Sequence, residues 1–106
     1  MNTFTHIERV AQVAPQTTVG INLTNYTIDY SKYKFLIIAF GDNAGNIIAT
    51  TTVPTILFTA GYGRFSAVYI ANQFLAQAMY IDSTTIGVGA MASTTTYGYG
   101  YVFGVW

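Results

Sequence analysis

The sequence contains no cysteine and very little charge. Of its 106 residues, four are Lys or Arg and four are Asp or Glu, so the formal net charge is zero. Charged residues make up 8% of the chain, against about 25% in an ordinary soluble protein. Because no basic cluster is available to neutralise several phosphates, we expect no nucleic-acid partner. The lack of cysteine excludes disulfides and thiolate metal ligands.

Long hydrophobic runs are also missing. The longest, FLIIAF at 35–40 and VYIA at 68–71, fall far short of the roughly 20 residues that a transmembrane helix requires, so we predict no membrane insertion. The opening segment, MNTFTHIERV, has no basic leader followed by an apolar stretch, and no secretory signal is expected. The length fits one domain, residues 1–106.

β-branched and aromatic residues occur in short runs between Gly, Asn, Asp and Pro, a pattern typical of strands. Residues 34–54, KFLIIAFGDNAGNIIATTTVP, predict a hairpin whose loop is GDNAGN. Its first arm, 35–40, is apolar on both faces, which indicates a central strand with something covering its second side. About eight short strands at intervals of about 8–12 residues predict an all-β protein, a compact antiparallel β-sandwich of jelly-roll-like architecture.

Three segments are harder to assign. Residues 67–80, AVYIANQFLAQAMY, fit either two strands or a helix with an apolar stripe, and the all-β surroundings favour strands. Residues 55–65, TILFTAGYGRF, predict a short strand and then a glycine-rich turn at 61–63. Residues 1–16 alternate poorly, and we predict a terminal arm or an edge strand that reaches a neighbouring subunit.

The closing segment TTTYGYGYVFGVW, 94–106, puts rings on one side of a strand and almost nothing on the other. Gly98, Gly100 and Gly104 leave the second face bare, and Gly87 and Gly89 repeat the pattern in STTIGVGAM. Glycine weakens a strand, so its repetition needs a cause. We predict that another backbone or a sister subunit approaches the bare face. We also predict that the rings form a core or the subunit interface of a homo-oligomer: Tyr97, Tyr99, Tyr101 and Phe103.

Catalytic residues are scarce, because the chain has one histidine and four dispersed carboxylates. His6 alone cannot form a metal site, and the three aspartates are better explained by strand ends and turns than by a glycosidase pair. We therefore predict no enzymatic activity, metal or cofactor. Aromatic faces on which sugars stack, beside polar neighbours, are the remaining candidate. We predict a saccharide site formed by two loops: Tyr62 and Arg64, with Asp42, Asn43 and Asn46 of the hairpin turn.

Two stretches combine aromatic and apolar strand residues. In NYTIDYSKYKFLIIAF, 25–40, a Tyr/Lys segment leads into a central apolar strand, and YGYVFGVW, 99–106, is an aromatic strand with a glycine near the chain end. On these motifs, residues 24–106 resemble the small C-terminal β-sandwich tip domains of bacteriophage and prophage tail-fibre, tail-tip and baseplate proteins. Such domains are typically homotrimeric and lie where a virion meets its host, often binding saccharide.

The resemblance implies a non-enzymatic virion component that is made in the host cytoplasm, assembles with itself and other virion proteins, and attaches to a host cell-surface glycan. Several weak glycan sites on one particle would then act together. The chain begins with its own Met and lacks the fibrous shaft that usually precedes such a tip, so two alternatives stay open. One is a capsid decoration or tail-accessory assembly protein, and the other is a stand-alone lectin-like carbohydrate-binding module.

Overall fold

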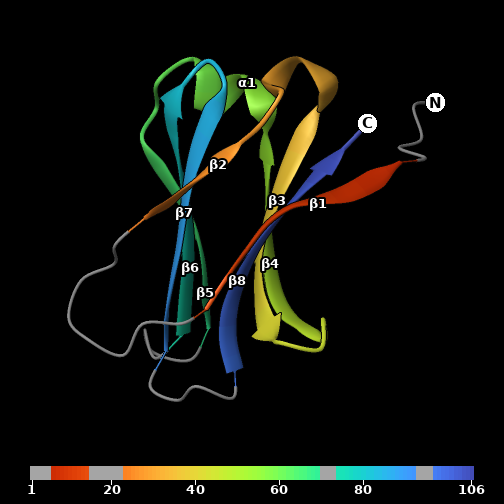
Figure 1. Cartoon of the computed structure of the whole chain (residues 1–106), viewed down its shortest axis with the longest axis vertical. Coiled ribbons are helices and arrows are strands. Elements are labelled where there is room, and N and C mark those ends of the chain that lie inside the picture. The colour runs from red at the N-terminus through yellow and green to blue at the C-terminus, as the bar shows by residue number, and fades with distance from the viewer. Residues whose placement is uncertain (1–5, 15–22, 70–73, 93–96) are drawn as a thin grey trace.

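Within the described residues, eight strands form two four-stranded antiparallel sheets that pack face to face (Figure 1). This computed structural model describes residues 6–14, 23–69, 74–92 and 97–106. Sheet A has the order β1-β8-β3-β4, formed by β1 (Ile7–Val13), β8 (Tyr97–Val105), β3 (Phe35–Asp42) and β4 (Ile47–Pro54). Sheet B has the order β2-β7-β6-β5, formed by β2 (Thr24–Thr27), β7 (Thr85–Ala92), β6 (Phe74–Asp82) and β5 (Arg64–Tyr69). The predicted all-β sandwich is confirmed.

Hairpins and nested pairings connect these strands. β3 and β4 form the predicted hairpin, and β5, β6 and β7 follow one another as a meander. β1 pairs with β8 and β2 pairs with β7, which are the outer pairings of a jelly roll. The inner strands differ from that arrangement, because β3 pairs with β4 and not with β6. β1 is an edge strand of its own sheet, while residues 1–5 and 15–16 of the predicted arm lie outside the described residues.

The ambiguous segment 67–80 forms strands. β5 pairs with β6 from Arg64↔Met79 to Tyr69↔Phe74, and residues 70–73 lie outside the described residues. In β6, Ala76 and Ala78 are fully buried while the residues between and beside them are half-buried, which is the period of a strand. Pairing with β5 on one side and β7 on the other bonds the backbone of β6, and this overrides its helix-favouring composition.

The strand predicted at the start of 55–65 is wrong, because Thr55–Thr59 form a short helix, α1. Ala60 N donates to Ile56 O at 3.0 Å, and the buried ring of Phe58 packs on Phe65 with centroids 4.6 Å apart. The run TILF is too short for its period to distinguish a buried strand from a helical turn. The predicted glycine turn does follow, since Gly61 and Gly63 have φ values of 80° and 97°.

The core lies between the sheets and draws its largest aliphatic and aromatic side chains from both, all fully buried: Leu36, Ile38, Phe40, Ile86, Val88 and Val102. Burying one such side chain contributes roughly 1.5–3 kcal/mol. On the opposite face of β3, Ala39 is buried but Phe35 and Ile37 are only half-buried. The strand β3 is therefore apolar on both faces, as predicted. Within a single copy of the protein, other residues cover its outer face only in part.

β8 turns its bare face inward, toward sheet B. A Cβ added to Gly100 would lie 3.0 Å from Ala90 Cβ and 3.3 Å from the backbone oxygen of Gly89. β7 therefore comes close to β8 here, and the predicted approach of another backbone is made by the second sheet of the same chain. Gly104 leaves room for a ring instead, because an added Cβ would overlap the side chain of Tyr33.

Candidate functional site

The five residues predicted to bind saccharide lie at opposite ends of the sandwich. Asp42 is the last residue of β3, and Asn43 and Asn46 lie in the turn between β3 and β4. Pro54 at the far end of β4 pairs with the first residue of β3, and α1 follows immediately, so Tyr62 and Arg64 lie a whole hairpin length away (Figure 1). The length of the β3–β4 hairpin therefore separates the two loops in space. The prediction of a single five-residue site is therefore corrected.

Each of these two groups makes local contacts. The carboxylate of Asp42 accepts hydrogen bonds from the backbone of Ala44 at 2.9 Å and of Asn46 at 3.0 Å, and from Asn46 Nδ2 at 2.8 Å. Hydrogen bonds from Asn46 are the main reason that the pKa of Asp42 is lowered. The carboxylate thus closes the turn. At the other end Tyr62 is 73% exposed, and Arg64 Nη1 lies 3.4 Å from Gln77 Oε1.

A groove of about 740 Å³ lies between the 3-10 turn η1 (Tyr30–Lys32) and α1. We call it the α1 groove. Its lining combines tyrosine rings with short hydroxyl side chains and one charge of each sign: Tyr30, Tyr33, Tyr80, Ser31, Thr55, Thr59, Ser83, Asp29 and Lys34, with Ile56 at the side. No single motif predicts this groove, because its residues come from three separate segments, 29–34, 55–59 and 80–83.

The tyrosines of the α1 groove are fixed by their own contacts. The rings of Tyr30 and Tyr80 lie 5.2 Å apart with an interplanar angle of 41°. The hydroxyl of Tyr30 donates to the backbone oxygen of Thr85 at 2.6 Å. Burial is the main reason that the pKa of Tyr30 is raised above its usual value of 10. The groove therefore has a firm aromatic wall.

Thr55 lines the same groove, and its side-chain hydroxyl makes no hydrogen bond with the described residues. The residue is 5% exposed, and its Oγ1 is buried without a hydrogen-bond partner among the described residues. Its backbone N donates to Lys34 O at 3.0 Å, so only the side chain is unsatisfied. Buried polar groups are nearly always bonded, and an unsatisfied one costs roughly 1–3 kcal/mol. The Thr55 hydroxyl is the feature of the groove that internal packing does not explain.

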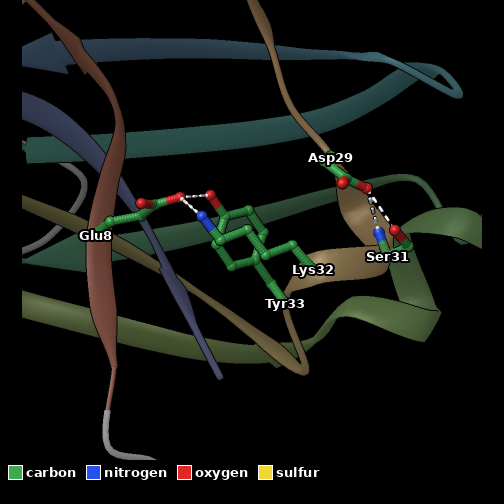
Figure 2. Close-up of polar contacts among 5 residues, drawn as sticks. All are labelled: Glu8, Asp29, Ser31, Lys32 and Tyr33. Atoms are coloured by element: carbon green, nitrogen blue, oxygen red, sulfur yellow. Dashed lines mark hydrogen bonds and ion pairs between the residues drawn. The ribbon is translucent and has the colours of Figure 1, made fainter.

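Beside the groove, the two ends of the described chain are joined by a terminal cluster made of His6, Glu8, Lys32, Tyr33 and Trp106. Figure 2 shows Tyr33 and Lys32 reaching the carboxylate of Glu8 on β1, where the Tyr33 hydroxyl donates to Glu8 and Lys32 Nζ lies 2.9 Å from it. The Tyr33 hydrogen bond is the main cause of the lowered pKa of Glu8, followed by that from Lys32. Gly104 is the backbone partner of Glu8, and its missing side chain leaves room for the Tyr33 ring, whose hydroxyl reaches Glu8.

Aromatic stacking completes the terminal cluster. The Trp106 ring stacks on His6 with centroids 5.1 Å apart, and Lys32 Nζ lies 4.4 Å from the Trp106 centroid. The carboxylate of Asp29, also drawn in Figure 2, accepts hydrogen bonds from Ser31 N at 3.0 Å and Ser31 Oγ at 2.5 Å and so caps η1. In the part of the chain that is described, no three His, Asp or Glu side chains come together as a metal site.

The outer face of sheet A carries the rings predicted for a subunit interface. Tyr99 and Phe103 are half-buried, whereas Tyr101 is only 2% exposed because its own chain covers it. The Tyr101 hydroxyl donates to Asp42 O, and its ring stacks on Phe103 with centroids 5.9 Å apart. Tyr97 pairs with Asp42 in the backbone, and its side chain lies outside the described residues.

Next to these rings is a shallow apolar depression of about 190 Å³, lined by Phe35, Ile37, Thr52 and Val105. At the edge of the same face, Ile7 pairs with Val105 and is 61% exposed. The outer face of sheet B carries a set of polar contacts, in which Gln77 Oε1 lies 3.4 Å from Arg64 Nη1 and Gln77 Nε2 donates to Ser66 Oγ at 3.2 Å. The two sheets thus present different surfaces.

No family model matches the chain, and neither a curated protein nor a solved structure shows significant similarity to it. None of the helices in the described ranges is long and apolar enough to cross a membrane.

Proposed function

We propose that this protein is a non-enzymatic bacteriophage virion component, similar to a tail-fibre or tail-tip protein, that forms a homotrimer and attaches to a host cell-surface glycan. The observation that carries the proposal is the outer face of sheet A, where β8 directs its rings away from its own core. Apolar and aromatic surface is enriched at the centre of subunit interfaces, and charge is depleted there. The scarcity of charge in the whole chain supports the same conclusion.

Size-exclusion chromatography coupled to light scattering, repeated after dilution, tests the assembly. We expect the mass of a trimer for the natural protein. Ile37→Lys places a charge in the middle of the outer face of sheet A and is expected to give a monomer. Leu75→Lys, the matched change at a half-buried outward position of sheet B, is expected to leave the trimer intact.

Two results would contradict the assembly proposal: a natural protein that is a monomer at every concentration, or an Ile37→Lys protein that stays trimeric. Because Ile37 is on a central strand, Ile7→Lys on the edge strand β1 serves as a second variant with less risk to folding. Circular dichroism of each variant separates dissociation from unfolding.

The glycan-binding part of the proposal is supported by the α1 groove, which combines rings and hydroxyl groups as saccharide sites do. An array of immobilised oligosaccharides, probed with the natural protein, tests it. A trimer without glycan signal would instead favour a capsid decoration or tail-accessory protein. A monomer with glycan signal would favour a stand-alone lectin-like module.

A further inference from the structure

We infer that the α1 groove is the saccharide site, and that the Thr55 hydroxyl hydrogen-bonds a hydroxyl group of a neutral sugar held against the tyrosine rings. The inference rests on the glycan binding proposed above. It assigns that binding to residues other than the loop residues expected from the sequence, which lie at two ends of the sandwich.

Size and lining suit one or two sugar rings. A volume of about 740 Å³ falls within the range of roughly 300–1,000 Å³ that is usual for small-molecule sites. The ring of Tyr80 is half-buried and packs against Tyr30, so it offers an apolar surface of fixed orientation. Ser31, Thr59 and Ser83 surround that surface with hydroxyl groups. The Ser31 hydroxyl already donates to Asp29 and the Thr59 hydroxyl to Ile56 O, so the lone pairs of these two oxygens are what they offer to sugar hydroxyls.

The charges in the groove favour a neutral ligand. Asp29 and Lys34 are the charged side chains in its lining, and they are of opposite sign. The Asp29 carboxylate is already bonded to Ser31, where it caps η1. A phosphate, sulfate or sialic acid would meet this carboxylate and find a single lysine instead of the paired cations that bind anions well. A neutral sugar avoids that repulsion.

Thr55 is the residue that internal packing leaves unexplained. Valine has nearly the same shape, so the hydroxyl adds nothing to the packing and leaves a buried polar atom unpaired. Threonine in a helix populates two χ1 rotamers, so rotation about one bond can exchange the methyl and hydroxyl groups without moving the backbone. A sugar hydroxyl in the groove would then supply the missing partner. The neighbouring terminal cluster has no such unused group at its centre, since Glu8 is bonded to both Lys32 and Tyr33.

Thr55→Val tests this inference because binding and stability should change in opposite directions. Removing an unsatisfied hydroxyl is expected to raise the melting temperature by about 4 °C. Losing the hydrogen bond to the sugar is expected to weaken binding by about 3- to 10-fold. Thr55→Ser keeps the hydroxyl and should retain the affinity. Thr24→Val, at an exposed position of β2, is the matched control and should change neither quantity.

The probe is an array of immobilised neutral oligosaccharides built from glucose, galactose, mannose and N-acetylglucosamine, with sialylated ones beside them. Affinities for the glycan of strongest signal are then measured by calorimetry. Should Thr55→Val fold poorly, Ser31→Ala and Thr59→Val at the sides of the groove replace it, each with an expected loss of about threefold.

The possible results distinguish the proposal that the protein binds glycans from the inference that the α1 groove is where it binds them. A natural protein that binds no oligosaccharide overturns the proposed function and this inference together. Glycan binding that is unaffected by the groove variants, or that is lost in Tyr62→Ala instead, overturns the groove and leaves the function standing. Signal confined to the sialylated glycans overturns the choice of a neutral ligand.

Discussion

β7 and β8 carry glycines at alternate positions, yet the two strands face opposite ways in the sandwich. β8 points Gly100 inward against β7, and its rings lie on the outer face of sheet A. β7 points Ile86 and Val88 into the core, and its Gly87 faces outward, under the side chains of Leu23 and Ile81. The same sequence pattern therefore has two uses.

Because β7 directs glycine outward and β8 directs rings outward, the two strands differ in how much they gain from contact with a second subunit. On the outward side of β7, Gly87 is covered by the side chains of Leu23 and Ile81 of its own chain, so this position requires no partner. The bare inward face of β8 brings the two sheets together but leaves Tyr99 and Phe103 half-exposed on the outside. A glycine pattern alone cannot show which of these arrangements is present. The arrangement is shown by the face of the sheet on which the larger side chains of the strand lie.

Gly104→Ala is expected to have the largest effect. An added Cβ would overlap the Tyr33 ring, which would have to move and lose its hydrogen bond to Glu8. We expect a loss of about 3 kcal/mol in the free energy of unfolding, measured by urea denaturation. In a double-mutant cycle with Tyr33→Ala, the cost of the alanine should shrink to less than half. Unchanged stability of Gly104→Ala would contradict the position of the ring.

Gly100→Ala is expected to cost less, about 1–2 kcal/mol. Its Cβ would lie 3.0 Å from Ala90 Cβ on the facing sheet and 3.0 Å from Val13 Cγ2 on the paired strand β1. Small shifts of these two neighbours can relieve the contacts in part. Ala90→Gly removes one of these carbons, so it should restore part of the loss when the two changes are combined. Independent, additive losses in the same urea experiment would mean that β7 and β8 do not meet at this point.

Glu8→Gln addresses the terminal cluster that Gly104 makes possible. The pKa of Glu8 is lowered below its ordinary value of 4.5, so its contribution to stability is present above about pH 4.5 and is lost as the pH falls through the lowered value. Thermal melts between pH 7 and pH 3 should therefore show a smaller acid loss for Glu8→Gln than for the natural protein. Tyr33→Phe removes the main cause of the shift, so its acid loss should also be smaller than that of the natural protein and should be complete at a higher pH. Parallel profiles for all three proteins would contradict this role.

Gly87→Ala is expected to have the smallest effect, within about 0.5 kcal/mol of the natural protein. The nearest atoms to its added Cβ belong to the side chains of Ile81 and Leu23, at 3.1–3.3 Å, and both lie near the surface. Such side chains can give way by a few tenths of an ångström. A loss as large as that of Gly104→Ala would show that the two strands do not differ as described.

The sequence was most informative where apolar runs flank clear turn residues. The two apolar arms on either side of GDNAGN, with the turn chemistry of Asp42, were sufficient to predict the β3–β4 hairpin. The short apolar run of α1 was not, because four residues cannot show a helical period. The cause of the β8 glycines was predicted only as a choice between a second sheet and a second subunit, since a bare face does not identify what covers it.

The binding site was predicted less well, for a topological reason. Tyr62 is in a loop and Asp42 ends β3 at a turn, but the end of the sandwich at which each residue lies depends on the direction of β3 and β4. The α1 groove brings together η1, α1 and the β6–β7 turn. These three segments carry no shared motif, so nothing in the sequence predicts that they meet.

Hydroxyl-radical footprinting of the natural protein at high and low concentration compares the two outer faces most directly. We predict that Tyr99 and Phe103 on sheet A are protected at high concentration and become more reactive on dilution, while Met79 on sheet B reacts equally in both. Reactivity of Tyr99 and Phe103 that does not change with concentration, in a protein that scatters light as a monomer, would contradict the assignment of sheet A as the subunit interface.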